Sequence, residues 1–237
     1  MSHEKILQAT VTGEAVQPIR LYYQLADKGR VISRFGQLRC MDFDQGANRW
    51  VWLYAYEARN LKFRKPYSLI PKQMHPIVIG SFFFKDSEAF LDLRSFDRAI
   101  KAIPFFHKYV GPEGARITYA AVVNRLFDAR EQFPASLDVF FSSGKMTERN
   151  PDESVAQIES LIRENRAGGK SDWFCLLEQR AKEPVPEIEK LPVNFYEDGI
   201  SSFEAALRVR QIVAFEHWKG NTDYTWYDVF KTMIPGS

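Results

Sequence analysis

The spacing of apolar residues changes near residue 93, and this change constrains the fold more than any other feature of the sequence. Before it, residues 19–25, 31–40 and 50–56 are rich in aromatic and β-branched side chains, which is typical of strands. After it, apolar residues recur at helical spacing. Strands followed by helices predict an α+β fold, with an N-terminal antiparallel sheet arranged as a meander and a predominantly helical C-terminal half.

Turn-forming residues separate the expected strands. Residues 26–29 and 44–48 combine glycine with short polar side chains, which is the composition of turns. Three prolines then mark a loop between residues 66 and 76. The apolar run 77–79 after this loop is short enough to be a buried strand.

Helix start signals follow residue 93. Ser95 can cap a helix that Pro104 should kink or shorten, and Thr118 opens a second helix. Residues 150–169 begin with a cap residue and a proline at the first helical position, and they end on two glycines. A further helix can restart at Ser171.

A last long helix is expected over residues 202–218, because Ser201 and Glu204 have the spacing of a capping box and Gly220 lies just beyond its end. Prolines and charged residues before it form a connector. The sequence therefore divides into three regions, which can also form one compact domain: a β-rich basic region (1–93), a helical region packed on it (94–183), and the connector with the C-terminal helix and tail (184–237).

The composition is that of a globular protein, with 45% apolar and 26% charged residues. Cys40 and Cys175 lie far apart, which argues against a disulfide framework and favours a reducing compartment. The first residues are polar, and the longest apolar stretch, residues 77–84, is too short to span a bilayer. We expect a soluble, cytoplasmic protein without membrane contact.

Positive charge is concentrated at the front of the chain. Residues 1–80 contain twelve Lys and Arg but six Asp and Glu, and no acid lies between Glu57 and Asp86. Within residues 49–72 the cations alternate with aromatic residues, a composition that suits single-stranded or structured nucleic acid, since cations neutralise phosphates and aromatic rings stack on bases. The predicted contacts are Arg49, Arg59, Lys62, Arg64, Lys65 and Lys72 for phosphates, and Trp50, Trp52 and Tyr67 for bases.

Two other interpretations of the sequence stay open. The aromatic residues of this segment can point into the core and leave an ordinary solvated basic loop. The protein can also be an adaptor or assembly subunit, with aromatic-rich helices that contact a protein partner or a second copy of the chain.

Catalysis has little support in the sequence. The histidines have no metal-ligand spacing, so no metal or other cofactor is expected, and Gly168-Gly169-Lys170-Ser171 lacks the earlier glycine of a phosphate-binding loop. The favoured prediction is a non-catalytic binding module. An enzyme with a histidine–carboxylate site around His75, His107 or His217 remains the third possibility.

Overall fold

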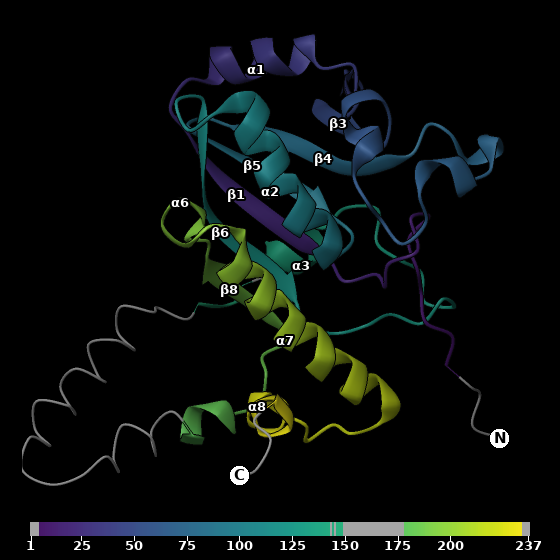
Figure 1. Cartoon of the computed structure of the whole chain (residues 1–237), viewed down its shortest axis with the longest axis vertical. Coiled ribbons are helices and arrows are strands. Elements are labelled where there is room, and N and C mark those ends of the chain that lie inside the picture. The colour runs from purple at the N-terminus through teal and green to yellow at the C-terminus, as the bar shows by residue number, and fades with distance from the viewer. Residues whose placement is uncertain (1–4, 143, 145, 149–177, 234–237) are drawn as a thin grey trace, which may run out of the picture.

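The protein is built around one eight-stranded sheet (Figure 1). The computed structural model describes residues 5–142, 144, 146–148 and 178–233. From one edge of the sheet to the other, the strand order is β2 (Met41–Asp44), β3 (Arg49–Leu53), β4 (Val78–Lys85), β5 (Glu88–Leu93), β1 (Ile19–Leu25), β6 (Ala115–Val123), β8 (Ile188–Pro192) and β7 (Thr147–Glu148).

Seven of these strands run antiparallel to their neighbours, and β7 pairs in parallel with β8. Strands β2 to β5 form a meander, because each lies beside the next one in the chain. Strand β1 is central, between β5 and β6, so the first strand pairs with segments that follow it by about seventy to one hundred residues. The α+β fold expected from the sequence is confirmed.

Helices lie mainly in the C-terminal half and cover one face of the sheet, with α2 and α7 in front of the strands in Figure 1. The helices are α1 (Lys28–Gln37), α2 (Phe96–Val110), α3 (Asp138–Phe141), α6 (Phe195–Asp198), α7 (Ile200–Lys219) and α8 (Trp226–Met233). Three 3₁₀ turns, η1 (Tyr56–Asn60), η2 (Tyr67–Leu69) and η3 (Lys72–Met74), lie between β3 and β4.

The two faces of the sheet carry separate apolar clusters. The larger cluster lies under α1, α2 and α7 and contains Leu21, Trp52 and Phe106. A smaller one, with Val123 and Phe141, lies on the opposite face beneath α3. That second face is only partly covered by helix.

The strand expected over residues 31–40 is wrong, because most of this segment is helix α1. The Asp27 side chain accepts a hydrogen bond from the N–H of Arg30 at 2.9 Å and caps the first turn. Val31 and Phe35, four positions apart, are the two buried side chains of the helix. In this segment, the helical spacing of the two buried residues outweighs the β-propensity of the individual residues.

The helix expected from Thr118 is also wrong, because this residue lies within strand β6. Strand β6 pairs on both sides, with β1 and β8. Ala120 and Val122 belong to one core cluster, and Ala121 and Val123 to the other. Consecutive apolar residues therefore reflect burial of both faces of a strand.

The helix expected at Ser95 is confirmed as α2, whose first turn is capped by the Ser95 hydroxyl. Pro104 lies inside α2 and does not end it. Helix α7 starts two residues before the expected 202–218 segment, with Gly199 rather than Ser201 at its N-cap, and it ends as expected at Gly220 in the left-handed conformation.

The helix expected over residues 150–169, the Gly168–Ser171 string and the helix start at Ser171 lie outside the described residues. In the part of the chain that the structure describes, no helix has both the length and the apolar character needed to cross a bilayer.

Candidate functional site

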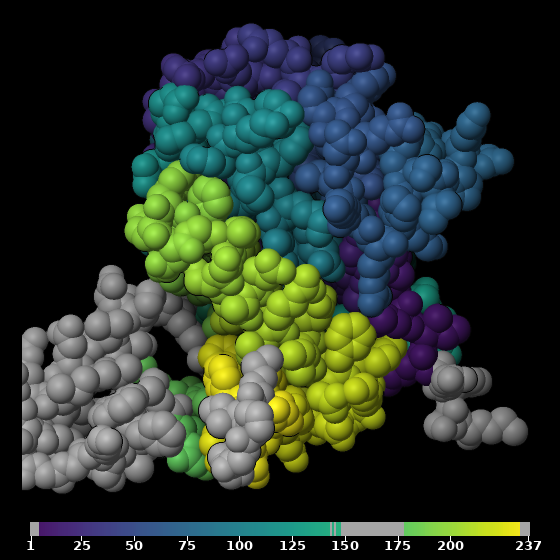
Figure 2. Space-filling view, viewed as in Figure 1, coloured from purple at the N-terminus to yellow at the C-terminus, as the bar shows by residue number. Residues whose placement is uncertain are grey.

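The cationic residues predicted to contact nucleic acid lie mostly on one projecting loop, residues 59–72, which we call the basic loop. Its chain passes through η2 between strands β3 and β4 and extends away from the sheet (Figure 1). In the space-filling view, the blue segment that contains it protrudes on the right of the molecule (Figure 2).

Hydrogen bonds and a buried ring anchor the basic loop. The Tyr54 hydroxyl donates to the carbonyl of Leu61 at 2.8 Å and accepts from the N–H of Tyr67 at 3.2 Å. Phe63 is buried, and its ring meets the Tyr54 ring edge-on with centroids 4.9 Å apart. The N–H of Lys65 donates to the carbonyl of Thr12 at 2.8 Å. These contacts fix the base of the loop against the core and the N-terminal segment.

The charged side chains of the basic loop face solvent. Arg59, Lys62, Arg64, Lys65 and Lys72 are exposed, and none of them forms an ion pair with a described residue. The Arg59 guanidinium lies 4.6 Å from the centre of the Tyr67 ring. Five exposed cations without acidic partners form a surface that attracts polyanions.

Arg49 has a different environment from the cations of the loop. It is half-buried in β3, and its Nε donates to the carboxylate of Asp44 at 3.0 Å. The structure therefore does not bring Arg49 into the group of unpaired cations.

The three aromatic residues predicted to stack on bases are placed differently from one another. Trp52 is 0% exposed and packs on Phe105 and Phe106, so its ring is closed to a ligand in this structure. Trp50 is half-buried and meets Phe35 of α1 edge-on. Tyr67 is also half-buried but lies on the basic loop beside Arg59. Of the three rings, Tyr67 is the one placed next to the cations.

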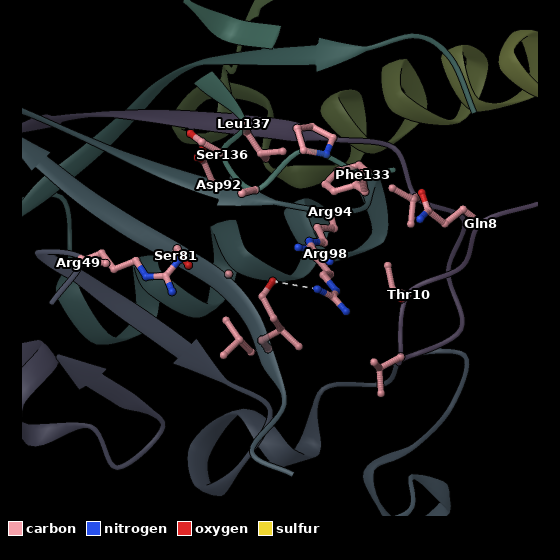
Figure 3. Close-up of a pocket in the computed structure, with 18 of the residues that line it drawn as sticks. Gln8, Thr10, Arg49, Ser81, Asp92, Arg94, Arg98, Phe133, Ser136 and Leu137 are labelled. Carbon is pink, nitrogen blue, oxygen red and sulfur yellow. Dashed lines mark hydrogen bonds between the residues drawn. The ribbon is translucent and has the colours of Figure 1, made fainter. Parts of the chain in front are cut away.

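A cavity of about 560 Å³ lies beside residues 8–11, on the sheet face that helices leave partly open (Figure 3). Strand β4 and the end of β5 form its floor, and residues 8–11 and 133–137 form its walls. Its lining includes three arginines, Arg49, Arg94 and Arg98, and two aromatic rings, Phe83 and Phe133.

Arg98 is the most buried charged group of the cavity lining, with 3% of the residue exposed. Its Nη2 donates to the Thr12 hydroxyl at 2.8 Å, and its Nη1 donates to the carbonyl of Ile79 at 3.4 Å. Its Nε makes no hydrogen bond and lies 3.8 Å from a carboxylate oxygen of Glu14. Burial lowers the pKa of Arg98 to about 10, Glu14 opposes this shift, and the charge of Arg94 adds to it.

Sequence reasoning missed Arg94 and Arg98. Arg94 precedes the Ser95 cap and Arg98 lies in the first turn of α2, so the two residues are close in sequence, but no motif marks them as a site. Nothing in the sequence indicated that this end of α2 meets the N-terminal segment, since that contact depends on the fold.

The histidines considered for catalysis do not form a histidine–carboxylate pair in the described structure. The Nε2 of His75 lies 3.3 Å from the carbonyl of Ile70, and that of His217 lies 2.7 Å from the carbonyl of Tyr224. His107 is exposed and packs against the rings of Phe195 and Tyr196. Among the described residues, no group of three or more histidine, cysteine or acidic side chains is arranged to hold a metal ion.

Cys40 is a buried residue with an unreactive thiol. Burial and the neighbouring carboxylate of Glu57 raise the pKa of its thiol to about 12. Glu57 also accepts a hydrogen bond from the N–H of Cys40 at 2.9 Å. A nucleophilic thiolate needs the opposite environment.

Helix α8, which begins with Trp226 and Tyr227, packs on the rest of the protein. Helix α8 lies against α7, and the Arg210 guanidinium is 4.8 Å from the centre of the Trp226 ring. Arg210 in turn donates to the carboxylate of Glu189 in β8 at 2.9 Å. These contacts dock the segment onto the sheet.

Comparison with known proteins adds no functional assignment, since no protein-family model, curated protein or solved structure matches the chain.

Proposed function

We propose that the protein is a non-catalytic binding module that holds single-stranded nucleic acid along the basic loop. The observation that carries this proposal is the set of five exposed cations without an ion-pair partner among the described residues: Arg59, Lys62, Arg64, Lys65 and Lys72. Unpaired lysine and arginine side chains neutralise phosphates and release condensed counterions, which is the main source of affinity in such complexes.

The half-buried Tyr67 supports contact with unpaired bases. Its ring lies within the loop and carries the Arg59 guanidinium over it at 4.6 Å. Aromatic rings and arginine planes stack on bases of any sequence, so this pair suits a single strand better than a duplex, whose bases are already stacked.

A salt titration with a fluorescent single-stranded oligonucleotide tests the proposal. We expect measurable affinity at low salt and a linear loss of log affinity with log salt. Replacing three loop lysines by glutamine (Lys62→Gln, Lys65→Gln and Lys72→Gln) should weaken binding at least about tenfold and reduce the slope by about 2, because each neutralised phosphate contributes roughly 0.7 on a single strand.

A matched control removes the same charge elsewhere. Lys28, Lys85 and Lys108 are exposed lysines outside the loop, so the triple change Lys28→Gln, Lys85→Gln and Lys108→Gln should alter affinity far less. Equal weakening in both triple variants would show a general charge effect and contradict a loop-specific contact. Absence of binding at low salt would also reject the proposal.

Exposed apolar side chains on the same projection favour a protein partner as the second candidate. Leu69 is 72% exposed and Met74 is 50% exposed. The adaptor interpretation based on aromatic-rich helices has less support at α2, because Phe105 and Phe106 of this helix are buried in the core. Substitution of Leu69 and Met74 by serine should leave oligonucleotide binding unchanged and abolish self-association or partner binding in sedimentation experiments if this second function holds.

A further inference from the structure

The cavity beside α2 is large enough for an organic ligand. Its volume of about 560 Å³ lies within the range of small-molecule sites, roughly 300–1,000 Å³, and far exceeds what a bare inorganic ion fills. The rings of Phe83 and Phe133 and the aliphatic side chains of Val11, Val16 and Leu137 provide apolar surface around it. The ligand that fits this lining has an apolar or aromatic body.

Two adjacent guanidinium groups give the cavity an anion-binding end. Arg94 and Arg98 both line it and lie beside each other in Figure 3. Arg98 is 3% exposed and retains an Nε without a hydrogen-bond partner. An unsatisfied donor on a buried cation is costly, and an anion within hydrogen-bond reach of it would remove that cost.

Arg94 has no ion pair with a described residue. Its guanidinium carbon lies 4.9 Å from the centre of the Phe133 ring. Partial burial lowers the pKa of Arg94. The positive charge of Arg94 in turn lowers the pKa of Arg98. The carboxylate of Glu14 lies 3.8 Å from the Arg98 guanidinium. Two neighbouring cations, of which only Arg98 faces a carboxylate among the described residues, favour a ligand with more than one negative charge.

The other charges of the lining are already paired. Arg20 binds Asp92 through two hydrogen bonds of 2.6 and 2.9 Å, and Arg49 binds Asp44 at 3.0 Å. These pairs leave Arg94 and Arg98 as the cations of the lining that make no hydrogen bond to a carboxylate of the described residues. Among polar groups, Gln8 also lines the cavity, and its buried Oε1 lacks a hydrogen-bond donor. That oxygen can accept from an amino or hydroxyl group of an organic ligand.

We propose that this cavity binds the phosphomonoester of a nucleotide, with Arg94 and Arg98 holding the phosphate and the aromatic and amide groups contacting the base and sugar. A phosphomonoester carries close to two negative charges at neutral pH and presents several acceptor oxygens to two guanidinium groups. The nucleotide is either free or the phosphorylated end of a strand, and the second source rests on the proposed function.

Calorimetric titration of the full chain with a nucleoside monophosphate tests the proposal. We expect saturable binding, and binding at least about tenfold weaker for the nucleoside without phosphate, the scale of one lost charge-assisted hydrogen bond. Arg94→Gln should weaken nucleotide binding by a similar factor. Arg34→Gln, which removes an exposed arginine of α1, is the matched control and should leave it unchanged.

Three results would overturn the proposal: no binding at millimolar nucleotide, equal binding of nucleotide and nucleoside, or full affinity in the Arg94→Gln variant. Because Arg94 is exposed and Arg98 is buried, this variant avoids the folding risk of changes at Arg98. A thermal melt of each variant checks that the variant is folded at the temperature of the binding measurement.

Competition identifies the source of the phosphate. Displacement of the nucleotide by an oligonucleotide with a terminal phosphate, but not by its hydroxyl counterpart, supports the strand end, whereas failure of both oligonucleotides to compete supports the free nucleotide. The triple lysine variant of the basic loop should bind the mononucleotide like the unchanged protein. Failure of the proposed function therefore shows in oligonucleotide affinity, and failure of the cavity proposal shows in mononucleotide affinity.

Discussion

The hydroxyl of Thr12 accepts a hydrogen bond from the Arg98 guanidinium at 2.8 Å and donates one to Glu14 at 2.6 Å. The carbonyl of the same threonine accepts from the N–H of Lys65 in the basic loop. Thr12 therefore joins the start of helix α2, a buried carboxylate and the proposed binding loop through three hydrogen bonds. Damage to this network should affect both stability and the loop.

Arg98→Met should lower the free energy of unfolding by about 3–5 kcal/mol, because it leaves the buried carboxylate of Glu14 without its cation. Urea unfolding measures this change. The double variant Arg98→Met with Glu14→Gln should be more stable than Arg98→Met alone, since it removes the uncompensated charge. If the stability loss of the double variant equalled the sum of the losses of Arg98→Met and Glu14→Gln alone, this result would contradict the coupling of the pair.

Asp27→Ala should destabilise the protein by about 1 kcal/mol, because it removes the side-chain cap of helix α1. Ser201→Ala is the matched control: Ser201 is exposed, and the N-cap of α7 is Gly199 without a side-chain cap. The Ser201 change should leave the denaturation midpoint unchanged. A larger loss at Ser201 than at Asp27 would restore the capping box expected from the sequence and contradict the observed helix start.

The helix ends show which local features the sequence could predict. Ser95 and Gly220 are helix ends that the sequence predicts correctly, because a cap and a left-handed glycine act through local backbone groups. Asp27 acts in the same local way, but the aromatic and β-branched content after it favoured a strand. The spacing of Val31 and Phe35 was the signal that could have corrected this prediction.

The non-local features could not be predicted. Strand β6 resembles a helix in sequence, because burial on both faces removes the alternation of an exposed strand. Whether Trp52 or Tyr67 is accessible depends on which face of β3 meets α2 and on the path of the loop. The cavity likewise depends on the meeting of α2 with the N-terminal segment, so Arg94 and Arg98 carried no signal of a site.

Gly80→Ala should destabilise the protein by about 1–3 kcal/mol, because a Cβ at this position of β4 would lie 2.8 Å from Leu93 and 2.9 Å from Leu91. Both leucines are buried and cannot move aside freely. Gly36→Ala is the control, since a Cβ there meets nothing within 4 Å. On helix α1 it should be neutral or stabilise by up to about 1 kcal/mol. In thermal melts, the midpoint of Gly80→Ala should fall, whereas the midpoint of Gly36→Ala should stay unchanged or rise.

Cys40 should resist thiol reagents until the protein unfolds. The test uses the Cys175→Ser variant, in which Cys40 is the single thiol of the chain. Because the raised pKa keeps the thiol protonated at pH 8, little thiolate is available, and burial blocks the reagent as well. Reaction with a chromogenic disulfide at pH 8 should be slow in buffer and rapid in urea.

The Glu57→Gln change separates the two causes of this protection. The negative charge of Glu57 raises the pKa of Cys40, and the change removes this charge. Burial, the larger cause of the raised pKa, stays in place. We therefore expect a modest increase in the labelling rate that stays far below the rate in urea. If Cys40 in the folded protein instead reacted as fast as in the unfolded protein, its thiol would have to be accessible and ionised. That result would contradict the buried, protonated thiol described above.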